Sequence, residues 1–120
     1  MLKTFYDAVA QGDMETVMAL LTDDIEFHVF GRSRVAGSYL GKDQILHFFV
    51  KLAETYGDTF RLEIRDILAN DRHGVVLALE RAQCGGKVLE NRAVHVYDIR
   101  DGKCAQCRAY NEHTWDELWT

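Results

Sequence analysis

The segment "NRAVHVYDIRDGKCAQCRAYN", residues 91–111, decides the fold, because it reads as two long strands joined by a tight turn at "RDGK", 100–103. An imidazole, His95, lies within the apolar run of the first strand. By the period of two along a strand, His95 shares its face with Ala93 and Tyr97. Valines occupy the opposite face, so both sides of this strand need apolar cover.

Two more strands precede this pair, which makes a meander. The predicted strands are 59–68, 75–83, 87–99 and 103–111, with turns at 70–74, 84–86 and 100–103. The strand 75–83 is apolar on both faces between Val75 and Leu79. Helices can cover only one face, so we expect a second copy of the chain to cover the other, giving a homodimer through the sheet.

Three helices and one strand are predicted before the meander. The helices carry their apolar faces at Leu2, Phe5, Tyr6 and Val9, then at Met14, Val17, Leu20 and Leu21, then at Ile45, Phe48, Phe49, Leu52 and Tyr56. Gly12 ends the first helix, Asp13 caps the second, and Gly57 ends the third. The segment 24–30 alternates as a strand does, and a glycine-rich loop over 31–41 follows it. This order predicts an α+β fold in which one curved antiparallel sheet wraps around three helices.

Composition limits the classes of partner. A chain of 120 residues predicts one domain over 1–120. The net charge of -5, with scattered Lys and Arg, argues against nucleic acid or an anionic membrane as partner. No apolar run reaches 18 residues, the N-terminus does not resemble a secretory signal, and the cysteine number is odd. We therefore expect a cytoplasmic protein with reduced thiols.

The pair of cysteines in "CAQC", 104–107, is not predicted to be a metal or redox motif. In a strand, residues three apart have α-carbons about 10 Å apart, beyond disulfide reach. Cys107 is expected in a pocket wall and Cys104 on the opposite face. No two of the five histidines have a convincing metal spacing, so we predict no metal and no cofactor.

Four stretches together carry a family resemblance: "QGDMETVMALLTDDIEFHVFG" (11–31), "AGSYLGKDQILHFFVKL" (36–52), "RAVHVYDIRDGK" (92–103) and "DELW" (116–119). In order and spacing they resemble the SnoaL-like branch of the nuclear-transport-factor-like superfamily, which includes the ketosteroid isomerases. The resemblance implies a cone-shaped, cystatin-like fold with an apolar pocket for steroids, polyketides or terpenoids. Catalytic members transfer protons, cyclise, hydrate or hydrolyse, whereas other members only bind.

The resemblance also suggests roles for single residues. Position 95 falls where ketosteroid isomerases carry a buried acid that donates a hydrogen bond to the substrate oxygen. Asn111 falls where SnoaL-type cyclases carry an acidic residue, and an amide cannot transfer a proton at neutral pH. Its neighbour Glu112 would substitute if a bulge re-aimed the strand. Asn111 simply making a turn is equally compatible with the sequence.

The catalytic pattern of the ketosteroid isomerases is not matched in register. Their base falls near Val29, beside His28, and their oxyanion tyrosine falls on Phe5, beside Tyr6. Steroid isomerisation by that mechanism is therefore not expected. Glu80 has two readings: a base with a raised pKa if it faces the pocket, or a strand-edge carboxylate paired with a neighbouring Arg or Lys.

The leading hypothesis is a cofactor-free acid–base enzyme, an isomerase, cyclase or hydrolase, acting on a small apolar molecule with His95 and Asn111 as catalytic residues. The alternative is a non-catalytic dimeric ligand-binding or accessory protein. The expected ligand-binding residues are Phe27, Tyr39, Phe48, Phe49, Tyr97, Cys107 and Ala109. An error of one residue in strand register would exchange inward and outward sets, which affects His28, Glu80, His95, Asn111 and Glu112.

Overall fold

The structure is a computed structural model that describes residues 1–31 and 34–112, apart from the Cys84 side chain. Its helices are α1 (Leu2–Gln11), α2 (Met14–Ala19), α3 (Gly41–Tyr56) and the short 3-10 helix η1 (Gly57–Thr59). Its strands are β1 (Leu21–Val29), β2 (Gly37–Leu40), β3 (Arg61–Ala69), β4 (His73–Cys84), β5 (Lys87–Arg100) and β6 (Lys103–Asn111).

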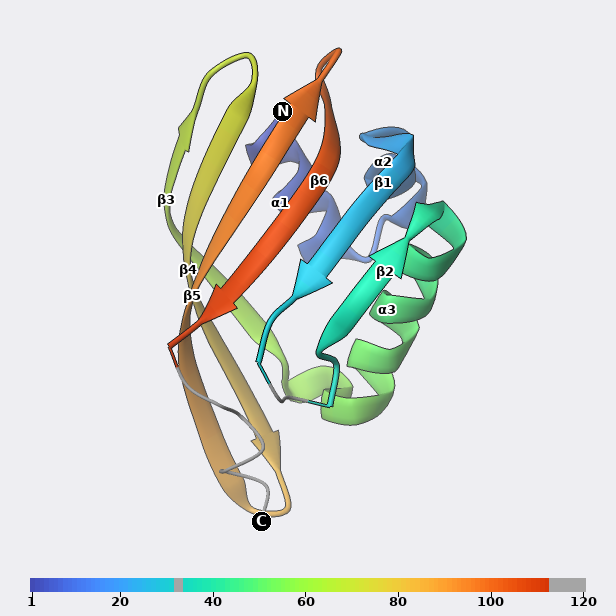
Figure 1. Cartoon of the computed structure of the whole chain (residues 1–120). Coiled ribbons are helices and arrows are strands. Elements are labelled where there is room, and N and C mark those ends of the chain that lie inside the picture. Colours follow the sequence, from blue (N-terminus) through green and yellow to red (C-terminus); the bar gives the residue numbers. More distant parts are fainter. Residues whose placement is uncertain (32–33, 113–120) are drawn as a thin grey trace.

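All six strands form one sheet, in the order β2-β1-β6-β5-β4-β3. Figure 1 shows the three α-helices on one face of this curved sheet, with the β4–β5 hairpin reaching beyond the other strands. The predicted α+β class and the meander from β3 to β6 are confirmed. The sheet is not wholly antiparallel, since β1 and β6 pair in parallel.

The helix boundaries follow the predicted capping chemistry. Gly12 ends α1 in the left-handed region at φ 70, a conformation that lacks a steric penalty only for glycine. Asp13 caps α2 by accepting a hydrogen bond from the Thr16 backbone N–H at 3.2 Å. Gly57 ends α3, as predicted. The hairpin turn between β5 and β6 has positive φ at Asp101 and Gly102, as a type I′ turn requires.

Further features of the sheet differ from the sequence prediction. The strand β1 begins at Leu21, which was predicted on the second helix, because pairing with β6 starts at this residue. The strand β2 lies inside the segment predicted as a loop, because pairing with β1 forms it rather than any alternation of its own residues. A bulge in β6 pairs Asp98 with Gln106 but Ile99 with Cys104. The extra residue brings Cys104 onto the side of the sheet that carries Cys107, so the predicted opposite placement of Cys104 is wrong.

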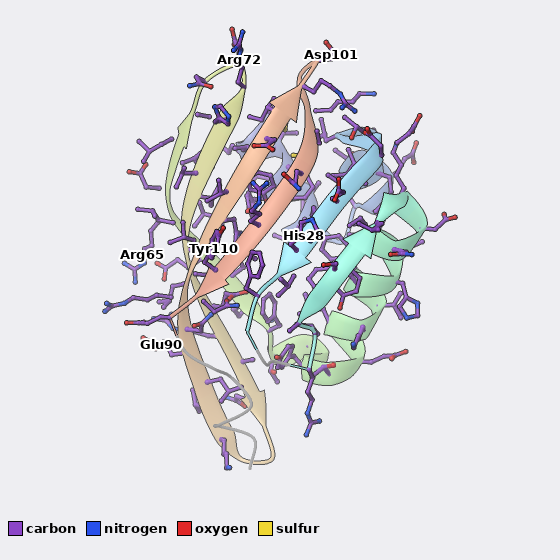
Figure 2. All side chains as sticks on the ribbon, viewed as in Figure 1. His28, Arg65, Arg72, Glu90, Asp101 and Tyr110 are labelled. Carbon is purple, nitrogen blue, oxygen red and sulfur yellow. The ribbon has the colours of Figure 1, made fainter. Side chains whose placement is uncertain are left out.

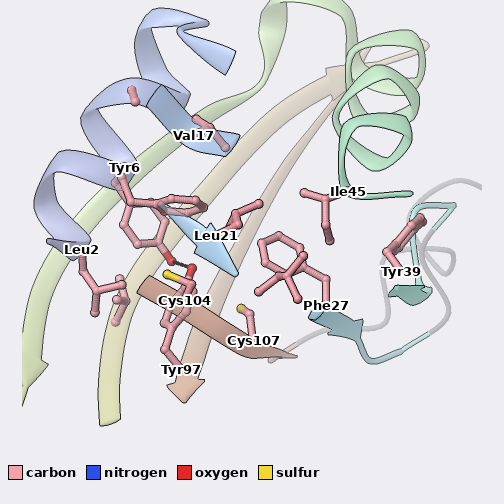
Figure 3. Close-up of a cluster of buried hydrophobic side chains, with 14 residues drawn as sticks. Leu2, Tyr6, Val17, Leu21, Phe27, Tyr39, Ile45, Tyr97, Cys104 and Cys107 are labelled. Atoms are coloured by element: carbon pink, nitrogen blue, oxygen red, sulfur yellow. Dashed lines mark hydrogen bonds between the residues drawn. The ribbon is translucent and has the colours of Figure 1, made fainter. Parts of the chain in front are cut away.

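The core lies between the sheet and the helices. Figure 3 shows Tyr6 and Leu2 of α1, Leu21 of β1 and Tyr97 of β5 packed in one buried cluster. The side chains of Cys104 and Cys107 belong to the same cluster. A second, smaller cluster joins Val35, Tyr56, Ala82 and Leu89 near the β4–β5 hairpin. Phe48 packs against both clusters. The predicted single domain over 1–120 stays a prediction, and the stretch 116–119, which carries part of the family resemblance, lies outside the described residues.

Candidate functional site

An apolar cavity of ≈ 100 Å³ lies between the two core clusters, where the sheet curves over α1 and α3. Of the residues expected at a site, it is lined by His95, Asn111, Phe27, Phe48, Phe49, Tyr97, Cys107 and Ala109. Tyr39 is not among the lining residues. Its ring packs against Phe48 with centroids 4.9 Å apart, and its hydroxyl donates to the Val35 carbonyl at 2.7 Å. Tyr39 therefore supports the wall from behind.

A hydrogen-bonded cluster of three side chains forms one polar part of the cavity. The Tyr6 hydroxyl oxygen lies 2.6 Å from His95 Nδ1 and 2.5 Å from the Tyr97 hydroxyl oxygen. The Tyr6 and His95 rings are also stacked, with centroids 5.9 Å apart and planes 14° apart. Helix α1 presents Tyr6 to the inward face of β5, which carries His95 and Tyr97 two residues apart.

Burial sets the charge of this cluster. Desolvation lowers the pKa of His95 to about 4, so its imidazole is neutral at neutral pH. Burial raises the pKa of Tyr6 and that of Tyr97 well above their usual values, so both are uncharged phenols. The charge of Glu80 also raises the pKa of Tyr6, and both residues line the cavity. The cluster can therefore donate and accept hydrogen bonds without carrying charge.

Glu80 is the second polar part of the cavity. It lies on the inward face of β4, and desolvation raises the pKa of its carboxyl to about 7. Its Oε1 accepts a hydrogen bond from Asn91 Nδ2 at 2.9 Å, and that bond opposes the rise. Of the two readings left open by the sequence, the structure places Glu80 in the pocket rather than in an ion pair at the strand edge. A carboxyl with this pKa can both take up and release a proton at neutral pH.

Asn91 and Asn111 continue the polar chain away from Glu80. Asn91 is 1% exposed, and its Nδ2 also donates to Asn111 Oδ1 at 2.8 Å. Asn111 in turn donates from Nδ2 to the backbone carbonyl of Phe30 at 2.9 Å. Both the oxygen and the NH2 group of the Asn111 side chain are thus hydrogen-bonded to other groups of the protein.

The other candidates from the sequence lie at the margin or outside. His28 borders the cavity, but its ring nitrogens bond to Ser38 Oγ at 2.8 Å and Glu26 Oε1 at 3.2 Å. Glu112 is exposed, with Oε1 4.0 Å from Arg92 Nη1. The β5–β6 register is unbroken from Ala109 to Asn111, so the bulge that Glu112 would have needed to replace Asn111 is not present there.

The two buried cysteines are poor nucleophiles. Desolvation raises the pKa of both Cys104 and Cys107 to about 12, which leaves almost no thiolate at neutral pH. They are free thiols that point into the core in Figure 3, and Cys107 also forms part of the cavity wall as predicted.

The sequence predicted that the protein holds no metal, and this absence stays a prediction. Within residues 1–31 and 34–112, no three His, Cys, Asp or Glu side chains come close enough to hold an ion. None of the helices described has both the length and the apolar character needed to span a lipid bilayer.

Two residues of the site were missed from sequence alone. The resemblance put the oxyanion tyrosine of the ketosteroid isomerases on Phe5, one residue before Tyr6. The available signal for Tyr6 was that a tyrosine on the buried face of a helix needs a partner for its hydroxyl. Asn91 was not considered, although it shares the inward phase of β5 with His95 and Tyr97. A polar residue in phase with a pocket face was the available signal for it.

The curved sheet, the helices of the N-terminal half and the apolar cavity between them define the cystatin-like, NTF2-like class of folds. Residues 2–107 match the model of the SnoaL-like domain. The chain therefore belongs to the SnoaL-like domain family.

Similar solved structures support the fold. Bal32a, from a soil-derived mobile gene cassette, is 28% identical with a TM-score of 0.90, covering 99% of this chain and 93% of that chain. A cystatin-like protein from Xanthomonas campestris is 22% identical with a TM-score of 0.86, covering 97% and 91%. TerC, co-crystallized with polyporic acid, is 20% identical with a TM-score of 0.80, covering 91% and 86%.

A similar protein is also found in Mycobacterium tuberculosis, where it is named uncharacterized protein Rv0034. It is 27% identical over 105 residues, which cover 86% of this chain and 79% of that protein.

Proposed function

We propose that this chain is a cofactor-free acid–base enzyme that moves a proton next to a carbonyl group of a small, uncharged, mostly apolar molecule. The observation that carries the proposal is the presence of two different polar groups in one apolar cavity. Glu80, with a pKa of about 7, is the base, and the Tyr6–His95–Tyr97 cluster binds the carbonyl oxygen. No Lys or Arg is among the described lining residues, which favours an uncharged ligand.

The proton step follows from the chemistry of these groups. The Glu80 carboxylate takes a proton from the carbon next to the carbonyl, and the electron pair moves onto the carbonyl oxygen to form an enolate. Protonated Glu80, which can first exchange its proton with solvent water, then returns a proton to that carbon or to another position of the conjugated system. The second outcome is an isomerisation, and no oxidant or co-reactant is needed for either.

A hydrogen bond from the three-residue cluster, donated by His95, stabilises the enolate oxygen. An imidazole nitrogen is a better acceptor than a phenol oxygen, so we assign the order Tyr97 to Tyr6 to His95 Nδ1 for the donated hydrogens. His95 then carries its hydrogen on Nε2, which makes no hydrogen bond within the described part of the chain. Nε2–H is the donor left for the oxygen of a bound molecule.

The separation of the two polar groups suggests the size of the ligand. Glu80 pairs with Asn91, and His95 lies four residues further along β5, about 13 Å at 3.3 Å per residue. Side chains that point into a concave face converge, so a molecule touching both groups has the size of one or two rings. Aromatic residues from several elements, including Phe27, Phe48 and Phe49, surround it.

Hydrogen–deuterium exchange tests this proposal without knowledge of the natural product. A panel of uncharged alicyclic, aromatic and conjugated ketones is incubated with the protein in D2O, and loss of the proton signal next to the carbonyl is followed by NMR. At least one ketone is expected to exchange faster with the wild type than with buffer alone. A panel in which several ketones bind but none exchanges would contradict the enzyme and support a non-catalytic ligand-binding protein instead.

We also propose that the chain forms a homodimer through the outer face of the sheet. Four apolar side chains cross that face in a row, Phe30, Tyr110, Val94 and Leu77, and each is between 36% and 46% exposed. Strand register places Val94 opposite both Tyr110 and Leu77, and Phe30 stacks on Tyr110 with centroids 5.0 Å apart. Figure 2 shows Tyr110 and His28 on this face, turned away from the helices.

A charge in the middle of this row should prevent association. Val94→Glu is expected to sediment as a monomer at concentrations where the wild type is a dimer, because a buried unpaired carboxylate is strongly unfavourable. Val50→Glu, on the exposed face of α3, is the matched control and should remain dimeric. A wild type that is monomeric throughout, or a dimeric Val94→Glu, would contradict this interface.

A further inference from the structure

A chain of hydrogen bonds begins at a backbone carbonyl and ends at the proposed base. The Phe30 carbonyl oxygen can only accept, so Asn111 must turn its NH2 group toward it, at 2.9 Å. The Asn111 oxygen then faces Asn91, which must turn its own NH2 group toward that oxygen, at 2.8 Å. The second hydrogen of the same NH2 group is donated to Glu80 Oε1, at 2.9 Å.

Burial makes this polarity hard to reverse. Asn91 is 1% exposed, so its amide cannot exchange protein partners for bulk water. Rotating the Asn91 amide by half a turn would set its oxygen against the Asn111 oxygen and the Glu80 carboxylate. Both contacts would be repulsive when Glu80 is ionised. The Phe30 carbonyl thus fixes the orientation of both side-chain amides in this chain of hydrogen bonds.

We propose that Asn91 and Asn111 are positioning residues, which together hold the ionised Glu80 carboxylate in one orientation toward the cavity. This inference rests on the proposed role of Glu80 as base. Asn111 then acts through Asn91 rather than on the bound molecule, which differs from the catalytic role that the sequence suggested for it. Because the hydrogen bonds begin at the Phe30 carbonyl, the orientation of the Glu80 carboxylate also depends on the position of the backbone that follows β1.

The expected consequence is a change in the titration of Glu80. A hydrogen bond donated to a carboxylate stabilises its charged form, so loss of the Asn91 amide should raise the Glu80 pKa further. The titratable side chains that face the cavity from the other elements are Tyr6, Tyr56, His95, Tyr97 and Cys107, and His28 borders the cavity from the outer face of β1. These side chains are the same in all the variants below, so a difference in the Glu80 pKa between variants reports on the chain of hydrogen bonds.

The experiment is a carbon-13 NMR titration of the glutamate carboxyl groups, with the Glu80 signal assigned by its absence in Glu80→Gln. Asn91→Leu keeps the side-chain volume but has no donor, and its Glu80 midpoint is expected to rise by about 1 pH unit. Asn111→Leu should raise the midpoint by less. The double variant should match Asn91→Leu alone, because Asn111 acts only through Asn91.

Gln106→Leu is the control, since Gln106 is an amide on β6 out of phase with Asn111, and it should leave the midpoint unchanged. Asn91→Ser, whose hydroxyl is too short to reach Glu80, replaces Asn91→Leu if the latter does not fold. An unchanged midpoint in the Asn91 variant, or additive shifts in the double variant, would overturn the positioning chain. The titration needs no substrate, so an absence of ketone exchange in the wild type would refute the proposed base while leaving the positioning result to stand on its own.

Discussion

Replacing Glu80 with Gln is expected to lower the rate of proton exchange about 10²- to 10⁴-fold and, at the same time, to make the protein more stable at pH 8. Gln has nearly the shape of protonated Glu and can keep the neighbouring Asn91 in contact, so the cavity should persist. It cannot take up a proton at neutral pH, so catalysis should be lost while ligand binding is largely retained.

The gain in stability follows from proton linkage. The Glu80 pKa is about 7 in the folded state, against 4.5 for an unperturbed Glu, so the folded state binds more protons between these values. The stabilisation that proton binding at Glu80 gives the folded wild type is therefore complete below pH 4.5 and is lost as the pH rises through 7. Over this window the loss reaches at most about 3 kcal/mol, and water entering the cavity would reduce it. Gln has no such loss.

Urea denaturation of both proteins at pH 4.5 and at pH 8 measures this difference. The two unfolding free energies should be similar at pH 4.5, and the variant should exceed the wild type at pH 8. Glu54→Gln removes the same charge from the exposed surface of α3 and serves as the control. A Glu80→Gln protein that exchanges ketone protons as fast as the wild type would rule out Glu80 as the base.

Replacing His95 with Phe is the second large effect that we expect. Phe keeps a ring in place to stack on Tyr6 but has no nitrogen to donate to a bound oxygen. Loss of a donor of this kind lowers kcat about 10²- to 10³-fold in enzymes that stabilise an oxyanion. The Tyr6 hydroxyl retains Tyr97 as a partner, so it is not left unpaired by the substitution.

The stability effect of His95 has the opposite sign to that of Glu80. Its pKa is about 4 in the folded state, against 6.5 when unperturbed, so the unfolded state binds more protons between these values. Stability from this group is full above pH 6.5 and is lost as the pH falls through 4, by at most about 3 kcal/mol. His95→Phe should therefore resist acid better than the wild type.

Acid unfolding followed by circular dichroism measures this second prediction. His47→Phe, an exposed ring on α3, is the matched control and should unfold as the wild type does. Unchanged acid sensitivity in His95→Phe would show that His95 is not a buried neutral imidazole. Undiminished exchange activity would remove it from the proposed site.

The two linkages overlap between pH 4.5 and 6.5, where they act against each other. As the pH rises through this window, Glu80 lowers the stability of the folded state and His95 raises it. The two contributions should partly cancel in the wild type. Each single variant removes one of them, so Glu80→Gln should gain stability and His95→Phe should lose stability with rising pH in this range.

The sequence predicted the elements that depend on local chemistry. Apolar spacing located the helices, Gly12, Asp13 and Gly57 marked their ends, and the Asp-Gly turn fixed the β5–β6 hairpin. Period-two alternation also placed His95 and Tyr97 on one inward face. These signals are local because a cap, a turn or a strand face is decided by residues a few positions apart.

Other features depended on residues that are distant in the chain. The strand β2 exists because β1 pairs with it, and the bulge that turns Cys104 inward is a property of the β5–β6 ladder. Neither has a local pattern that predicts it. A shift of one residue in register exchanges the two faces of a strand, which is why the sequence could not choose between the two readings of Glu80.

What the sequence by itself determined is therefore the order of the elements, their ends and the apolar face on which His95 lies. Only the tertiary structure decided the chemistry of the site. It brought Tyr6 to His95 across 89 positions and Glu80 to Asn91 and Asn111, because hydrogen-bonding distance depends on how a curved sheet closes over its helices. Burial in that closed space, rather than any motif, separates the pKa of Glu80 from that of His95.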